Sequence, residues 1–258
     1  MTELYIYMVL FGVLIFFAGS CIFSFLNVIV YRVPRQMSFV KGFSICPTCG
    51  HQLGALDLVP IWSYVFLKGK CRYCKTSIGS RDTWIEAFGG CAALFCAWQY
   101  RMNILQGVTV FLFLCVMTVV TFMDIDTMEI ANGCWMFTLL LAIMSFFAFP
   151  EITLVQRLIG MICISVPMLL LTMLVSGAFG GGDIKLMFAC GAFLGWKLTL
   201  VSSLLGILFG GIYGIYLLAA KKKDKKEHFA FGPFLCLGMT IGWFYGMQIF
   251  DWYTGFLI

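Results

Sequence analysis

Two aspartates stand beside long apolar runs, where an ionisable side chain is costly and tends to be functional. Asp124 follows one such run in the stretch FMDIDTMEIAN, and Asp183 ends GAFGGGD just before another. Two carboxyl groups held close together cannot both ionise easily, so one acts as a base and the other as an acid. Such a pair can activate water against a peptide carbonyl while it polarises that carbonyl. Asp124 and Asp183 therefore predict aspartic proteolysis.

Asp126 competes with Asp124 as the partner of Asp183. Two positions along a helix turn it by about 200°, so both side chains cannot share one face. Asp124 follows the apolar run directly, whereas Asp126 has the position of a solvated cap residue, and we therefore predict Asp124. The alternative for Asp124 or Asp183 alone is a helix end at the lipid headgroups, where a carboxylate costs little.

Three glycines, Gly180, Gly181 and Gly182, precede Asp183. Glycine adopts backbone conformations closed to other residues and lets another backbone approach closely. We expect these glycines to make room for an extended peptide, with a plain interhelical turn as the alternative. Lys185 could stabilise the ionised form of Asp183 or hold an acidic substrate residue. It could equally be an anchor whose stem lies along apolar surface.

Four cysteines form a second candidate site, in the polar segment at residues 32–83. Cys46 and Cys49 make one C-x2-C pair, and Cys71 and Cys74 make another after 21 intervening residues. Each pair can present two thiolates to one tetrahedral zinc, and four such ligands leave no open position. We therefore predict a structural zinc, which would support a segment with little core of its own. A pair of redox dithiols is the alternative, although a reducing cytoplasm disfavours disulfides.

The composition is that of a polytopic membrane protein, with 62% hydrophobic residues, 11% charged residues and a mean hydropathy of +0.98. A bilayer core is about 30 Å thick and needs about 20 apolar residues per helix. We expect an all-α fold with eight transmembrane helices. Their ranges are 4–31, 84–100, 104–123, 130–149, 158–176, 186–196 with 183–185 added, 198–220 and 229–250. The first has no cleavage site after it, which favours a span over a signal peptide.

Lysine and arginine predict the orientation, because they are enriched in cytoplasmic loops. The segments 32–83 and 221–226 and Lys185 carry 14 of the 17 basic residues, and eight spans place all of these on one side. The other side receives Arg101, Arg157 and Lys197. We therefore expect the two aspartates at the cytoplasmic face and both termini outside. Attraction to anionic lipid headgroups is enough to explain the lysine run at 221–226, so a nucleic-acid partner is not needed.

The expected domains are a transmembrane helix at 1–31, a cytoplasmic zinc-binding module at 32–83 and a seven-helix peptidase domain at 84–258. The alternative function is a cation-coupled transporter that uses the intramembrane aspartates. That alternative would need carboxylates nearer the midplane of the bilayer.

The chain resembles the type IV prepilin leader peptidases, membrane aspartic proteases of the GxGD type, over nearly its whole length. The matching stretches are SFLNVIVYRVPRQMS, both cysteine pairs with LDLVPIWSYVFLKGKCRYC, TWIEAFGG, FMDIDTMEIAN, GGGDIKLMFACGAFLGW and FAFGPFLCLG. The resemblance implies an enzyme of the bacterial cytoplasmic membrane that cleaves type IV prepilins or pseudopilins after a glycine, at the cytoplasmic face. It also implies that Asp124 and Asp183 are the catalytic pair.

Relatives with the four-cysteine loop are typically bifunctional, so the resemblance also implies N-methylation of the new terminal residue with S-adenosylmethionine. The residues do not identify that cofactor site, since there is no glycine-rich turn of the Rossmann kind. Glu86 and Asp57 lie in family-like stretches and are candidates for the cofactor site. The alternative for Glu86 is a residue at the level of the lipid headgroups, and the alternative for Asp57 is a turn cap. The chain departs from the family at Ala131, where proline is usual, and at Gly181, where several relatives carry a bulky residue.

Overall fold

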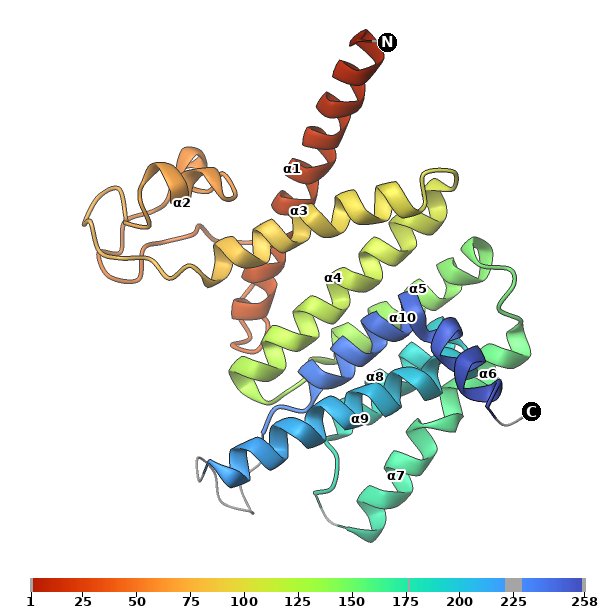
Figure 1. Cartoon of the computed structure of the whole chain (residues 1–258). Helices are drawn as coiled ribbons and strands as arrows, with labels where there is room; N and C mark the ends of the chain where they lie inside the picture. Colours follow the sequence, from red (N-terminus) through yellow and green to blue (C-terminus); the bar gives the residue numbers. More distant parts are fainter. Residues whose placement is uncertain (1, 176, 221–228, 257–258) are drawn as a thin grey trace. The chain divides into compact units, whose positions relative to one another are not determined.

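The computed structural model describes residues 2–175, 177–220 and 229–256, so the basic run at 221–226 lies outside the described residues. The described residues are mostly helical (Figure 1). The helices are α1 (Thr2–Arg32), the 3₁₀ turn η1 (Ala55–Asp57), α2 (Trp62–Phe66), α3 (Arg81–Gln99), α4 (Ile104–Thr127), α5 (Asn132–Ala148), α6 (Leu154–Cys163), α7 (Ser165–Leu174), α8 (Gly181–Leu194), α9 (Trp196–Ala219) and α10 (Gly232–Thr254). The chain divides into two compact units, Met1–Phe111 and Leu112–Ile258.

A helix occupies each of the eight ranges expected from the hydropathy, with two differences that matter. The range 158–176 holds two helices, α6 and α7, rather than one. Pro167 explains the break, because it has no N–H to donate and its ring crowds the carbonyl four residues earlier, at Cys163, where α6 ends. The second difference is that α8 begins at Gly181, so two of the three glycines lie inside the helix.

Within the described part of the chain, five segments are long and apolar enough to cross a membrane. They are Tyr5–Arg32, Ile104–Thr127, Leu154–Leu174, Trp196–Leu217 and Gly232–Thr254. Of the other expected spans, α5 and α8 have only 17 and 14 residues, and α3 carries charged residues in its first two turns. The chain is therefore a multi-pass, all-helical membrane protein, and a total of eight spans stays a prediction.

In the first unit, α1 and α3 pack together through small residues. A Cβ atom on Gly89 would collide with the ring of Phe23, and one on Gly19 would collide with the carbonyl of Gly89. Small residues allow two helix backbones to approach closely where no water drives their association. The chain leaves α1 at Arg32 and enters α3 at Arg81, with α2 between them (Figure 1). The same segment contains η1 and the four cysteines.

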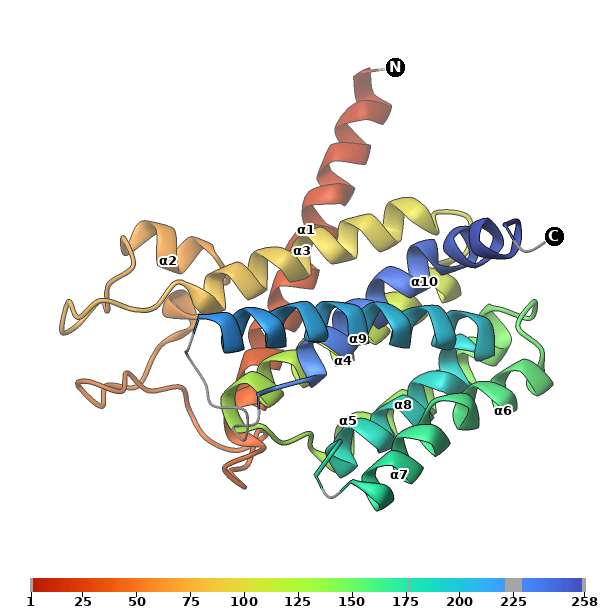
Figure 2. The ribbon, with the colours of Figure 1, turned by 60° about the horizontal axis from the view of Figure 1, so that its bottom comes forward.

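In the second unit, α8 is the central helix. It contacts α5, α6, α7, α9 and α10, and α5 to α7 lie together with it in Figure 2. From Leu186 to Leu194 every residue except Phe188 is buried. Its backbone meets that of α6 where Gly191 faces Gly160, because a Cβ atom on either residue would overlap the other's carbonyl. Only the first turn of α8 is less enclosed, and this turn contains Asp183.

Candidate active site

Asp124 lies in the last turn of α4 and is 6% exposed. Its Oδ2 accepts a hydrogen bond of 2.8 Å from the backbone N–H of Gly232, the first residue of α10. The first N–H groups of a helix have no partner within the helix, so a carboxylate at this end satisfies one of them. Asp126 is exposed in the same turn, as expected from its different face. The structure thus buries Asp124 and leaves Asp126 exposed.

Asp183 lies in the first turn of α8. Its Oδ1 is buried and has no hydrogen-bond partner among the described residues. Native proteins rarely leave a buried polar atom unpaired, and such an atom needs an explanation such as a catalytic role or a bound molecule. The free oxygen of Asp183 is therefore available for a water molecule, a substrate carbonyl or a shared proton.

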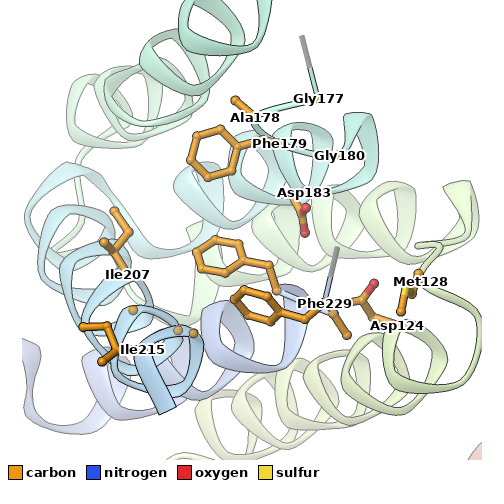
Figure 3. Close-up of a pocket in the computed structure, with 15 residues that line it drawn as sticks. Asp124, Met128, Gly177, Ala178, Phe179, Gly180, Asp183, Ile207, Ile215 and Phe229 are labelled. Carbon is orange, nitrogen blue, oxygen red and sulfur yellow. The ribbon is translucent and has the colours of Figure 1, made fainter. Parts of the chain in front are cut away.

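Asp124 and Asp183 line the same cavity, which has a volume of about 790 Å³. Figure 3 shows their carboxylates directed into it from two different helices, with Phe179 and Phe229 among the other lining residues. Phe231 and several residues of α9, three of them glycines, complete the wall. The second unit thus brings the two aspartates, 59 positions apart in the sequence, to one apolar cavity.

The three glycines before Asp183 adopt ordinary backbone angles, because none of them has a positive φ. Two of them provide space instead. A Cβ atom on Gly180 would lie 3.1 Å from Oδ2 of Asp183, and one on Gly182 would lie 3.0 Å from the side chain of Ile130. A Cβ atom on Gly181 would meet nothing within 4 Å, so a larger residue at this position is compatible with the fold.

Lys185 is exposed, and its Nζ donates a hydrogen bond of 3.2 Å to Oδ1 of Asn132, the first residue of α5. This contact joins the amino-terminal ends of α5 and α8. The N-cap of α5 is Ala131, with φ −62° and ψ 140°. Proline would impose nearly this φ value. The alanine therefore gives the entry to α5 a φ value that a proline would also adopt.

The four cysteines of the first unit come together as a cluster. All four Sγ atoms of Cys46, Cys49, Cys71 and Cys74 lie within 4.8 Å of one another, which is a grouping that could hold a metal ion. Sulfurs at about 2.3 Å from a tetrahedral zinc lie about 3.8 Å apart. The Sγ atoms of Cys46 and Cys74 are separated by 3.8 Å. The donor set and its spacing therefore fit one tetrahedral metal.

The two C-x2-C pairs have matching local structures. Isolated antiparallel bridges, between Ile45 and Gln52 and between Lys70 and Ser77, close a small loop around each pair. In each loop the residue after the second cysteine has a positive φ, 69° at Gly50 and 60° at Lys75. These equivalent turns direct the thiols of both pairs to a common centre.

Hydrogen bonds in these loops favour the thiolate form that a metal needs. Backbone N–H groups of Cys49 and Thr48 lower the pKa of Cys46. The hydroxyl and backbone of Thr76 lower the pKa of Cys74 to about 6. Burial and the neighbouring thiols of Cys46 and Cys74 instead raise the pKa of Cys49 to about 11, so the loops favour the thiolate at Cys46 and Cys74 and not at Cys49.

Family models match both halves of the chain. Residues 17–100, which include the cysteine cluster, match the bacterial peptidase A24 N-terminal domain. Residues 111–215, which include both aspartates, match the type IV leader peptidase family. The chain belongs to the type IV leader peptidase family.

Individual relatives agree with this family assignment over almost the full length of both partners. The match to the prepilin leader peptidase/N-methyltransferase of Bacillus subtilis strain 168 is 28% identical and covers 93% of this chain and 96% of the relative. Proteins of the same name from Aeromonas salmonicida strain A449 and Pseudomonas aeruginosa are 26% and 27% identical and cover 95% and 92% of this chain. No solved structure matches the chain significantly.

Asp57 and Glu86, the two candidates for the cofactor site, make structural contacts in this leader peptidase. Asp57 Oδ1 pairs with Nε of Arg72 at 2.6 Å, and its Oδ2 accepts from the N–H of Gly54 at 3.1 Å. Glu86 Oε2 accepts a hydrogen bond of 2.8 Å from the N–H of Ile61. Ile61 has a φ of 63°, which is rare for a β-branched residue. Both carboxylates thus hold the polypeptide around the cysteine cluster.

Gly232 and Arg72 contribute to these sites, but sequence reasoning did not select them. A Gly-Pro pair at position 232 is a recognisable helix start, since proline is favoured in the first turn. That signal shows where α10 begins and does not reveal which carboxylate lies there. The partner of Arg72 is equally hidden, because a surface arginine between two cysteines resembles any other topology signal.

Proposed function

We propose that this chain is a prepilin leader peptidase that also N-methylates the amino terminus it creates. The observation that carries the proposal is that Asp124 and Asp183 line one cavity in a chain of the leader peptidase family. The names of the relatives, which include both activities, support the second reaction. Both family models describe peptidases, and neither describes a cation transporter.

In the proposed mechanism, Asp124 and Asp183 hold one proton between them. The ionised carboxylate removes a proton from a water molecule, whose oxygen then attacks the carbon of the scissile carbonyl. The protonated carboxyl group donates a hydrogen bond to the carbonyl oxygen and stabilises the charge that develops there. When the tetrahedral intermediate collapses, the C–N bond breaks and the leaving nitrogen receives the proton that the carboxylate took from water. The hydrogen bond from Gly232 keeps Asp124 in place during these steps.

We propose that the substrates are type IV prepilins or pseudopilins and that cleavage follows a glycine. The cavity supports a peptide substrate, because it is mainly apolar and its polar groups include the two carboxylates. The absence of a side chain on Gly180 leaves space beside Asp183. Lys185, exposed two residues after Asp183, would hold an acidic residue of the substrate.

The membrane arrangement is also part of the proposal. We propose eight spans, with the five apolar segments supplemented by α3, α5 and α8. The basic segment 32–83 and the ends of α4 and α8 that carry the aspartates would then lie at the cytoplasmic face, with both termini outside. The functional division would be a transmembrane helix at 1–31, a zinc-binding module at 32–83 and a seven-helix peptidase domain at 84–258.

Zinc is the proposed metal for the cysteine cluster, with Cys46, Cys49, Cys71 and Cys74 as its ligands and one ion per chain. When bound, it would hold the two C-x2-C loops together and so stabilise the module. S-adenosylmethionine is the proposed methyl donor. We assign no residue to its binding, since Glu86 and Asp57 already have structural partners.

The full chain, purified in detergent, tests the proposal directly. It is incubated with a peptide that spans the leader junction of a type IV prepilin, together with isotope-labelled S-adenosylmethionine. Mass spectrometry should show a mature peptide cut after the glycine and one labelled methyl group on its new terminus. Intact peptide after prolonged incubation with folded protein would contradict the peptidase assignment.

A further inference from the structure

Arg157 is a buried cation in a membrane protein, and the sequence places it merely among the basic residues of the outer side. In the structure it lies in the first turn of α6 and is 4% exposed. A positive charge in the first turn of a helix opposes the dipole of that helix. A buried charge is also costly unless its hydrogen bonds are satisfied. The position of Arg157 therefore needs a reason outside α6.

The guanidinium group binds the carboxyl-terminal ends of two other helices. Its NH1 donates to the carbonyls of Ala192 and Phe193 in α8, at 3.0 and 3.2 Å, and to Oγ of Ser145 in α5. Its NH2 donates to the carbonyls of Ser145 and Phe149, at 2.9 and 3.2 Å. The last carbonyls of a helix have no partner within the helix, and a cation there is favoured by the dipole. Arg157 thus joins the ends of α5 and α8.

The same end of α8 contacts α4, the helix that carries Asp124. The ring of Phe193 stacks on that of Phe113, with centroids 4.3 Å apart and planes within 3°. Asp183 lies ten residues before Phe193, and Asp124 lies eleven residues after Phe113. At 1.5 Å per residue, the two aspartates are about 15 and 17 Å along their helices from the stacked rings. Both aspartates therefore lie at similar distances along their helices from the stacked rings.

The opposite end of α5 and α8 is joined as well. Lys185 Nζ donates to Asn132 Oδ1 at 3.2 Å, close to Asp183. Between the two ends, Gly191 and Gly160 bring α8 against α6, so Arg157 and the helix it supports belong to one packed group. A displacement of the Phe193 end of α8 would therefore move Asp183 along the helix axis.

We propose that Arg157 is a positioning residue for peptide cleavage, because it holds the ends of α5 and α8 and thereby sets the level of Asp183 relative to Asp124. This inference rests on the proposed peptidase function. Reacting groups displaced by about 1 Å can lose about 100-fold in rate. The loss should appear in kcat, since the substrate-binding walls of the cavity are not altered.

The test compares Arg157→Met, Arg157→Lys and Ser145→Ala with the wild type, using full-length protein in detergent. Ser145→Ala removes one hydrogen-bond acceptor of Arg157, and it replaces Arg157→Met as the test variant if that protein does not fold. Arg101→Met, which removes an exposed arginine, is the control. Cleavage of a prepilin peptide is measured per folded molecule, as kcat, KM and the pH profile of kcat.

We expect Arg157→Met to lower kcat roughly 10- to 100-fold, with KM within about threefold of the wild type. Its pH profile should shift, because a changed separation alters how the two aspartates share their proton. Arg157→Lys should recover part of the rate, Ser145→Ala should lose a few-fold, and the control should stay within about twofold. A folded Arg157→Met or Ser145→Ala protein with the kcat and pH profile of the wild type would overturn the inference.

Hydrogen exchange provides a second arm that does not depend on activity. Amides of residues 181–188 should exchange at least about tenfold faster in Arg157→Met or Ser145→Ala than in the wild type, whereas those of α9 should change less. Equal protection of this segment in wild type and variants would overturn the inference. A wild type that cleaves no prepilin peptide would instead contradict the proposed function, and the exchange result would still decide the role of Arg157.

Discussion

The backbone N–H of Gly232 donates a hydrogen bond of 2.8 Å to Oδ2 of Asp124, across 108 positions of the sequence. Gly232 begins α10, so this carboxylate is held by a helix end that lies far away in the chain. A Cβ atom on Gly232 would lie 2.8 Å from the same oxygen. The position of Asp124 therefore depends both on the start of α10 and on the lack of a side chain there.

Replacing either aspartate with the isosteric amide should abolish peptide cleavage. Asp124→Asn and Asp183→Asn each remove a group that can exchange a proton with water or substrate, and such catalysis contributes about 100- to 10,000-fold. We expect losses in this range or larger, with normal amounts of folded, membrane-inserted protein. Asp126→Asn is the matched control and should keep nearly full activity. Cleavage at the normal rate by either of the first two variants would exclude the proposed pair.

Gly232→Ala should displace the carboxylate of Asp124 without changing any titratable group. Because the new methyl group would press on Oδ2, we expect kcat to fall by roughly tenfold to 100-fold with little change in KM. Gly133→Ala adds the same methyl group in the first turn of α5, where nothing lies within 4 Å, and serves as control. Single-turnover cleavage of a labelled prepilin peptide measures the effect. Equal rates for the two variants would show that the contact with Gly232 is dispensable.

Loss of one cysteine ligand should remove the metal and affect the two activities unequally. We expect about one zinc per chain in the wild type, and substoichiometric zinc in Cys46→Ser and Cys71→Ser, because a structural site needs all four thiolates. Methyl transfer should fall more than cleavage, since the cluster and the aspartates belong to different units. Elemental analysis and the mass-spectrometric assay measure both, with exposed Cys91→Ser as control. Metal-free wild type with exchangeable disulfides would favour redox dithiols instead.

The ion pair between Asp57 and Arg72 predicts how the stability of the module depends on pH. The hydrogen bond and charge of Arg72 hold the pKa of Asp57 below its usual value of about 3.9. A lowered folded-state pKa gives stability that is fully present above the unfolded value and is lost as pH falls through the folded value. We therefore expect Asp57→Asn to weaken the module by the same amount from pH 5 to pH 8. Below about pH 4 the variant should differ less from the wild type.

Hydrogen exchange of residues 54–58 and 69–72, corrected for intrinsic rates, measures this effect. Lys70→Met removes a positive charge from the same loop without removing the ion pair, and it should leave the protection of residues 54–58 unchanged. If the loss of protection in Asp57→Asn disappeared between pH 5 and pH 8, the assigned direction of the Asp57 pKa shift would be contradicted.

Glu86 offers a test of whether its carboxylate anchors the module or binds the methyl donor. Glutamine can still accept the hydrogen bond from Ile61, whereas leucine cannot. We expect Glu86→Gln to keep most methyl transfer and Glu86→Leu to lose roughly tenfold, with cleavage nearly unchanged in both. Labelled methyl incorporation measures the activity, and limited proteolysis around residues 59–67 measures the order of the loop. A Glu86→Gln protein with an ordered loop but no methyl transfer would show that the negative charge of Glu86 is needed to bind the methyl donor.

The sequence alone determined the membrane character, the approximate positions of most helices, the cysteine cluster and the two aspartates as candidates. These features depend on local composition and short spacing, such as apolar length or a C-x2-C pair, and they need no knowledge of distant contacts. The break between α6 and α7 was missed, although Pro167 is a local signal, because a continuous apolar run dominated the interpretation. The functional contributions of Asp124 and Asp183 stay predictions that the variants above test.

The tertiary structure decided which groups hold those candidates in place. Gly232 meets Asp124, Arg157 meets the ends of α5 and α8, and Glu86 meets Ile61, mainly through backbone N–H or carbonyl groups. Every residue except proline offers a backbone N–H, and every residue offers a carbonyl, so no residue type marks these partners in the sequence. Their pairing follows only from how the helices pack, and for this reason the sequence does not reveal that Gly232 and Arg157 support the proposed active site.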